Sequence, residues 1–370
     1  MTTADRTPLH PDLAPAQRDC LEALPLSGNH VVSGPPGSGK SLLAAHRAVH
    51  LALTGRPTLL LSRSRLLRRL LGDTLGGLST PEAPVEAATV HAWILRRFGG
   101  DAPRSEDGWF DWPALIERAG ITLDESGRMA PHLVIDEGQD LAPGFYRLAR
   151  IAAASITVFA DECQRLTDTN STLAEITRAL GRSTGRSDVG GNHRNTREIA
   201  SLAEHFSVGG PRPGMPVRRG EPPRVRRYSG DRHLTDDIVA LAKARTRPRV
   251  GVIVNSSHTA AALMRRLERA GLAHPPQLYS SMAASGRYRD LDLERPGVVL
   301  LHRASAKGLD FDTVVIPDTE TDSATDPTSA ALRMAYYVMI TRARRHLVLG
   351  WQGNRLPAHL TGLSDRAVIE

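Results

Sequence analysis

Short apolar runs recur along the chain, and each ends in a small, polar or glycine residue. The runs lie at 30–33, 58–62, 133–136, 156–160, 250–254, 298–302, 313–316 and 347–349. Helix-like stretches such as 41–53 and 259–270 separate many of them. Continuous apolar strands that alternate with amphipathic helices predict an α/β fold, in which parallel sheets are covered by helices on both faces.

The length and the turn-rich segments indicate how this fold is divided. A chain of 370 residues is long enough for two domains. The stretch 181–191 is rich in Gly and Ser and predicts a linker, so we expect domains at 1–185 and 186–370. The polar stretch 99–131 predicts a small insertion in the first domain. The stretch 209–227, rich in Pro, Gly and Arg, is either a basic nucleic-acid arm or a solvated loop.

Charge and cysteine content narrow the class of protein. Lys and Arg number 47 against 40 Asp and Glu, which gives a formal net charge of +7. That balance favours polyanionic partners, nucleic acid first, although an arginine-rich proteome would produce it too. Two cysteines exclude a disulfide framework and a zinc site. Without an apolar leader or a long apolar run, we expect a cytoplasmic protein that makes no membrane contact.

A glycine-rich loop follows the first apolar run and opens a helix. It matches the pattern G-x-x-x-x-G-K-[ST] and comprises Gly34, Pro35, Pro36, Gly37, Ser38, Gly39, Lys40 and Ser41. The glycines let backbone N–H groups converge on phosphate oxygens, and the helix N-terminus adds partial positive charge. Lys40 can reach the β- and γ-phosphates, and the Ser41 hydroxyl can hold Mg²⁺. The loop therefore predicts a nucleotide site, but it does not reveal how the energy is used.

An apolar run at 133–135 ends in two carboxylates, Asp136 and Glu137. Asp136 is suited to the Mg²⁺ shell, and Glu137 is suited to activating an attacking water as general base. A kinase rarely needs such a base, so the pair favours hydrolysis of the nucleotide. A helix N-cap pair is the structural alternative.

Residues 136–140 read Asp-Glu-Gly-Gln-Asp and resemble the D-E-x-Q-D signature of superfamily 1 DNA helicases of the UvrD/Rep type. Two upstream elements, residues 13–17 and residues 89–93, are similar to elements of that family as well. The resemblance implies that Gln17 reads adenine, in agreement with an amide that both donates and accepts. Residues 89–93 resemble the family's T-F-H-S-F element, which implies that His91 and Trp93 lie beside single-stranded DNA.

Further elements follow in the family's order. Residues 158–164 resemble G-D-x-D-Q, which implies that Gln164 senses the γ-phosphate. Residues 192–195 resemble N-Y-R-[SN], which implies that His193 stacks on adenine in place of Tyr and that Arg194 reaches the γ-phosphate. Residues 306–312 resemble A-K-G-L-E-F-D and residues 337–344 resemble Y-V-A-L-T-R-A-R. These last two resemblances imply that Asp310 contacts the nucleotide and that Lys307 contacts nucleic acid. They also imply that Arg342 is a second arginine finger.

The resemblance implies an ATP-dependent motor made of two RecA-like P-loop NTPase domains, with ATP and Mg²⁺ between the two lobes. Single-stranded DNA is the expected partner, with RNA as an alternative, and a protein partner such as a nuclease would supply any cutting activity. The intervals between motifs are short, which implies a minimal core lacking most of the family's inserted subdomains. The family's aromatic residue after Gln164 is missing, since Arg165, Leu166 and Thr167 follow. A regulatory or partner-dependent NTPase without unwinding activity is therefore the main alternative.

Overall fold

The chain forms two compact units, Met1–Gly191 and Asn192–Glu370. The computed structural model describes residues 9–106, 109–122, 130–161, 171–209, 214–244, 249–280, 291–293 and 295–370. Each unit contains one sheet, and every strand pairing in both sheets is parallel. The predicted α/β class is confirmed, and the architecture fits two RecA-like domains.

The sheet of the first unit has the strand order β3-β2-β4-β5-β1-β6. Its strands are β1 (Asn29–Ser33), β2 (Thr58–Ser62), β3 (Val85–Thr89), β4 (His132–Ile135), β5 (Ser155–Ala160) and β6 (Gly185–Asp188). Its helices are α1 (Pro15–Glu22), α2 (Lys40–Ala52), α3 (Arg65–Gly76), α4 (Val90–Phe98), α5 (Trp112–Thr122), α6 (Pro143–Ala152) and α7 (Leu173–Leu180).

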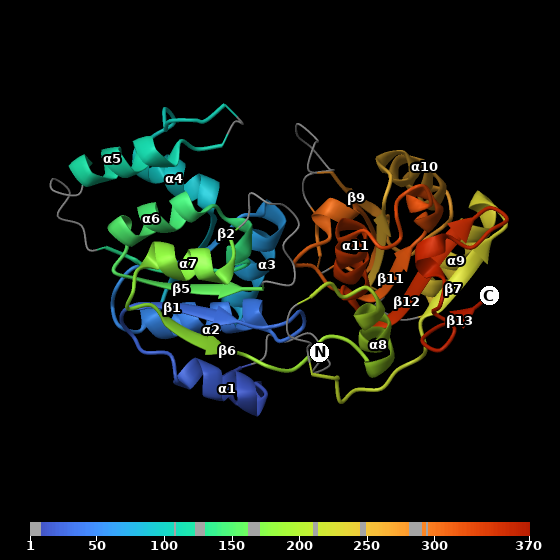
Figure 1. Cartoon of the computed structure of the whole chain (residues 1–370), viewed down its shortest axis with the longest axis horizontal. Coiled ribbons are helices and arrows are strands. Elements are labelled where there is room, and N and C mark those ends of the chain that lie inside the picture. Colours follow the sequence, from blue (N-terminus) through green and yellow to red (C-terminus); the bar gives the residue numbers. More distant parts are fainter. Residues whose placement is uncertain are drawn as a thin grey trace. The chain divides into compact units, whose positions relative to one another are not determined.

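Both faces of this sheet are buried, because successive strand residues point to opposite sides. Leu133 and Ile135 pack with residues of α4 to α7, whereas Val134 between them packs with residues of α1 to α3. Figure 1 shows α5, α6 and α7 on one side of the sheet and α1 on the other. All three strand residues are fully buried. This explains why the core strands are continuously apolar rather than alternating.

The sheet of the second unit has the strand order β13-β7-β12-β11-β8-β10-β9. Its strands are β7 (Arg224–Tyr228), β8 (Arg249–Val254), β9 (Gln277–Tyr279), β10 (Gly297–His302), β11 (Phe311–Ile316), β12 (Ala343–Gln352) and β13 (Val368–Ile369). Its helices are α8 (Arg197–His205), α9 (Asp231–Lys243), α10 (Ser257–Glu268) and α11 (Ala330–Ile340). Helices α9 and α10 share one apolar cluster with the sheet, and α8 and α11 contact each other and β12.

Two segments differ from their prediction. Residues 185–188 lie in the predicted linker but form strand β6, which pairs with β1 at the edge of the first sheet. The first unit therefore extends past the predicted boundary of 185. Residues 224–227 lie in the predicted basic arm or loop but belong to β7. Its arginines are accommodated because Arg226 pairs with Asp237 and Glu370.

The predicted insertion contains α5 and a short antiparallel pairing between Arg104 and Phe110. Phe110 is 1% exposed and joins the core of the first unit. Among the described residues, no helix is both long enough and apolar enough to cross a bilayer.

One buried histidine predicts an acid-sensitive second unit. His359 is 5% exposed, lies against Tyr336 with ring centroids 4.6 Å apart, and has no partner for Nε2 among the described residues. Burial lowers the pKa of His359 from 6.5 to about 4, although Asp322 opposes the shift. The unfolded chain therefore binds a proton at a higher pH than the folded chain does. Between pH 7 and pH 5 this linkage costs about 2 kcal/mol of unfolding free energy.

We expect His359→Leu to lose that part of the pH dependence. Urea unfolding at pH 7 and pH 5 measures it, and the exposed His258 changed to Leu is the control. Equal losses of stability in the native and His359→Leu proteins would contradict the assignment.

Candidate nucleotide-binding site

The glycine loop lies where the prediction requires it, between strand β1 and helix α2. Gly37 and Gly39 have φ angles of +82° and +89°, a region that side chains disfavour. Helix α2 begins at Lys40, directly after Gly39. The helix N-terminus and its first N–H groups are therefore presented by the loop, as phosphate binding requires.

Gln17, on α1, lies against this loop and is 5% exposed. Its Nε2 donates to the Ser38 carbonyl at 2.8 Å, and its Oε1 accepts from the Ala14 N–H at 3.0 Å. A Cβ atom on Gly39 would collide with the Gln17 amide. The structure therefore brings Gln17 and the loop together. The Nε2 and Oε1 atoms of Gln17 each keep capacity for a further hydrogen bond. The predicted contact of Gln17 with adenine stays a prediction.

Lys40 is buried and points back across the loop. Its Nζ donates to the carbonyls of Gly34 at 2.6 Å and Pro35 at 2.9 Å, and lies 3.2 Å from Asp161 Oδ2. Asp161, after β5, is 1% exposed. A buried carboxylate thus helps to position the ammonium beside the loop.

Asp136 follows β4 and is 1% exposed. Neither of its carboxylate oxygens has a hydrogen-bond partner among the described residues. Burial, and after it the charge of Glu137, raises the pKa of Asp136 to about 7, against smaller opposing effects of the nearby Ser41 hydroxyl and of Lys40. Two buried carboxylate oxygens that lack a well-formed hydrogen bond fit a cation, because a divalent ion would supply compensating positive charge.

Glu137 has a φ angle of +52° and is the one non-glycine residue with positive φ in the part of the chain that the structure describes. Such a backbone is unfavourable for glutamate and is typical of functional sites. The turn continues into Gly138–Asp140, where a Cβ on Gly138 would collide with Val158. Glu137 is 8% exposed, and its Oε2 accepts a hydrogen bond from Gln139 Nε2.

Gln139 connects the two halves of the site. Its Nε2 donates to Glu137 Oε2 at 2.5 Å, and its Oε1 accepts from the Asp161 N–H at 2.9 Å. Glu137, Gln139, Asp161 and Lys40 therefore form one continuous buried chain of contacts. The sequence placed Gln139 and Asp161 inside motifs but assigned them no role, because their meeting depends on the adjacency of β4 and β5. Gln164, the predicted γ-phosphate sensor, lies outside the described residues.

In the second unit, several arginines surround Asp310. Its carboxylate lies 3.4 Å from Arg194, 3.4 Å from Arg249 and 3.3 Å from Arg344. Burial by itself would raise the pKa of Asp310, but these arginines, with Arg344 first, lower it overall. The structure thus brings together the predicted residues Arg194 and Asp310 in one ion-pair cluster that remains charged.

The segment around Arg194 is also joined to the segment around Arg342. Asn195 Nδ2 donates to the carbonyls of Thr341 at 3.1 Å and Ala343 at 2.6 Å. Arg342 itself is 1% exposed, and its guanidinium donates to the carbonyls of Val338 at 2.9 Å and Leu309 at 3.3 Å. His193 is exposed and Lys307 is half-buried. The roles of these residues toward a nucleotide or nucleic acid stay predictions.

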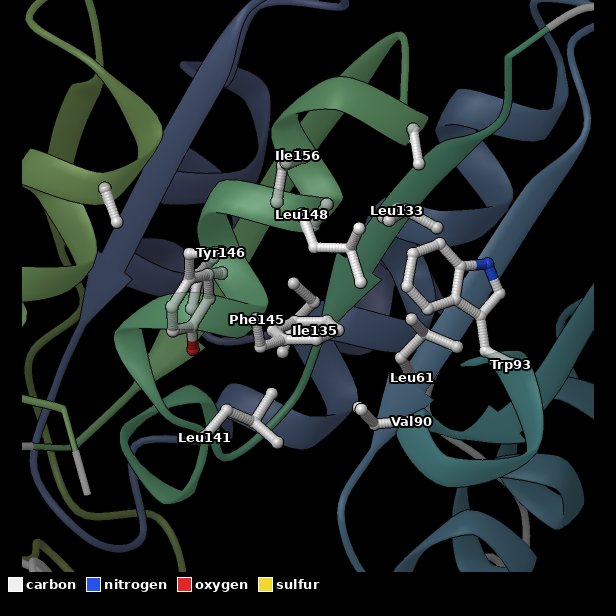
Figure 2. Close-up of a cluster of buried hydrophobic side chains, with 14 of the residues drawn as sticks. Leu61, Val90, Trp93, Leu133, Ile135, Leu141, Phe145, Tyr146, Leu148 and Ile156 are labelled. Carbon is white, nitrogen blue, oxygen red and sulfur yellow. The ribbon is translucent and has the colours of Figure 1, made fainter. Parts of the chain in front are cut away.

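The two predicted nucleic-acid residues of the first unit have different surroundings. Trp93 is 4% exposed and packs on Phe145 with ring centroids 6.0 Å apart. Figure 2 shows its ring directed into the cluster that includes Leu61 and Leu133. His91 is half-buried, and its Nε2 lies 3.1 Å from Arg104. The structure therefore places Trp93 in the core and His91 at the surface.

These features define the chain as a P-loop α/β protein with two carboxylates at the end of a neighbouring strand. No protein-family model and no curated protein matches the sequence.

Two solved helicase structures are similar to this one. The C-terminal domain of a possible DNA helicase from Lactobacillus plantarum WCFS1 is 20% identical with a TM-score of 0.37, over 48% of this chain and 97% of that chain. PRRSV helicase is 13% identical with a TM-score of 0.43, over 94% of this chain and 55% of that chain. This chain therefore spans about half the length of the viral helicase chain.

Proposed function

We propose that this protein is an ATP-dependent nucleic-acid motor, either a helicase or a single-stranded DNA translocase, of the UvrD/Rep type. One observation carries the proposal: the buried chain of contacts from Lys40 through Asp161 and Gln139 to Glu137. It connects the lysine suited to bind a triphosphate with a carboxylate suited to activate water. A protein that only bound nucleotide would not need the Glu137 carboxylate.

The proposal gives further residues of the first unit a role at the nucleotide. Ser41 and Asp136 would hold Mg²⁺, which when bound supplies positive charge to the phosphate oxygens. The unpartnered oxygens of Asp136 support that assignment. Gln17 would bind adenine, and the backbone N–H groups of the loop's non-proline residues would bind the phosphates.

The second unit would supply Arg194 and Arg342 to hydrolysis, with His193 and Asp310 as further nucleotide contacts. The ion pair with Asp310 supports this role for Arg194, because it restricts the orientation of the guanidinium. Arg342 would exchange its backbone carbonyl partners for phosphate oxygens. Single-stranded DNA, or RNA as the alternative, would be the substrate, in line with a net charge of +7.

ATP turnover by the purified full chain, measured with and without single-stranded DNA, tests the proposal. We expect DNA to stimulate turnover and Lys40→Ala to abolish it, because the ammonium no longer reaches the phosphates. Strand displacement on a forked duplex distinguishes unwinding from translocation alone. An ATP turnover rate that neither DNA nor RNA changes would contradict the proposal of a nucleic-acid motor.

A regulatory or partner-dependent NTPase is the second candidate. It is favoured by Arg165, Leu166 and Thr167, which stand where the family has an aromatic residue for base stacking. ATP turnover that responds to a protein partner such as a nuclease, but not to nucleic acid, would favour it.

A further inference from the structure

A cluster of aromatic and cationic side chains lies outside the nucleotide site, and the predicted insertion contributes half of it. Its members, called here the Trp109 surface, are Arg63, His91, Arg104 and Trp109. The Arg63 guanidinium carbon lies 4.9 Å from the centre of the Trp109 ring. Both Arg63 and Arg104 are exposed, and Trp109 is half-buried. An indole next to exposed guanidinium groups is an arrangement that recognises planar, negatively charged ligands.

The Trp109 surface rests on the hydrophobic core of the first unit. Phe110, the neighbour of Trp109, is 1% exposed, and Arg104 lies over its ring at 4.2 Å from the centre. The Ser105 N–H donates to the Trp109 carbonyl at 2.9 Å, and the Asp111 N–H donates to the Pro103 carbonyl at 3.0 Å. These bonds pair residues 103–105 with residues 109–111 and position the backbone of Trp109 before any ligand binds, which lowers the entropy cost of stacking.

The position of the surface connects it with the catalytic carboxylates. Arg63 follows β2 and His91 follows β3, so both lie at the carboxyl edge of the sheet, where Glu137 follows β4. Arg63 Nη1 also donates to the Asp140 carbonyl at 3.0 Å, one residue after Gln139. Ligands of parallel α/β sheets bind at this edge.

We propose that the Trp109 surface is a stacking seat for one base of a single-stranded nucleic acid. The base stacks on the indole of Trp109 in the place now taken by Arg63, and the guanidinium groups of Arg63 and Arg104 turn to the flanking phosphates. The proposal rests on the proposed nucleic-acid function and deepens it. It also supplies an aromatic contact in a chain that lacks one after Gln164, from a residue that no motif marked.

The Trp109 surface does not require a particular sugar, because every base has a π-face and both backbones carry phosphates. The experiment therefore uses fluorescently labelled oligo(dT) and oligo(U) of equal length, with anisotropy as the readout. The variants are Trp109→Ala, Trp109→Phe and Arg104→Ala. Arg118→Ala is the matched control, because Arg118 is a partly exposed arginine of the same unit that pairs with Asp101 instead.

We expect Trp109→Ala to weaken binding about 5- to 150-fold, equivalent to about 1–3 kcal/mol. Trp109→Phe should recover most of the loss, since it keeps a ring. Arg104→Ala should reduce the slope of log affinity against log salt by about 1, and Arg118→Ala should leave both quantities unchanged. Melting temperatures of all variants establish that they are folded.

The outcomes separate this inference from the function on which it rests. If the native protein binds an oligonucleotide and Trp109→Ala binds it equally well, the stacking seat is wrong and the motor proposal stands. The same holds if Trp109→Ala lowers the melting temperature without weakening binding. The contact between Arg63 and Trp109 would then only stabilise the fold. If the native protein binds neither oligonucleotide at low salt, both proposals fail.

Discussion

Glu137→Gln should lower the rate of ATP hydrolysis about 10²- to 10⁴-fold, which is the usual contribution of a general base. Glutamine keeps the size of the side chain and an oxygen that can accept from Gln139 Nε2, but it cannot take a proton from water. Binding of Mg²⁺ and ATP should change much less. Single-turnover hydrolysis together with equilibrium binding of a fluorescent ATP analogue measures the two effects separately.

Glu86→Gln is the matched control for this variant, because Glu86 lies on β3 of the same sheet and pairs with Arg96 at the surface. It should hydrolyse ATP at the native rate. Hydrolysis by Glu137→Gln within a few-fold of the native rate would remove Glu137 from the mechanism and leave a site that only binds nucleotide.

Arg194→Ala should lower the rate of ATP hydrolysis about 10³- to 10⁵-fold, the range typical of arginines that stabilise charge on a transferring phosphoryl group. The effect should fall on kcat more than on nucleotide affinity, since the charge develops in the transition state. Steady-state kinetics over a range of ATP concentrations separates the two quantities.

Arg249→Ala distinguishes a role in chemistry from a role in the ion-pair cluster. Arg249 contacts the same carboxylate, Asp310, but no motif assigns it to the nucleotide. We expect its removal to reduce stability without the large loss of kcat. If Arg249→Ala and Arg194→Ala reduce kcat equally, the cluster as a whole supports the fold and Arg194 has no special role.

The positions of many core strands could be predicted from the sequence, because buried parallel strands are continuously apolar. The run at 58–62 and strand β2 coincide, and the run at 298–302 differs from β10 by one residue. Strand β7 escaped prediction because its sequence, Arg-Val-Arg-Arg-Tyr, is stabilised by partners far along the chain, Asp237 and Glu370. Strand β6 could not be predicted either. Its Gly-Arg-Ser-Asp sequence has no apolar run, and it forms a strand because it pairs with β1.

The candidate site divides in the same way. The loop at 34–41 and the carboxylates Asp136 and Glu137 are local patterns, in which neighbouring residues and a strand end are sufficient to indicate the chemistry. The roles of Gln139 and Asp161 are not local, because the two residues belong to turns after different strands and meet only when β4 and β5 pair.

The sequence by itself determined the alternation of strands and helices, the phosphate-binding loop and the type of side chain available for chemistry. Each of these depends on residues close together in the chain. The tertiary structure decided which side chains meet and which are exposed: Trp93 packs into the core, and Trp109 lies beside Arg63 at the surface. Both tryptophans belong to segments whose orientation is decided by packing on distant strands and helices, and no local pattern records that packing.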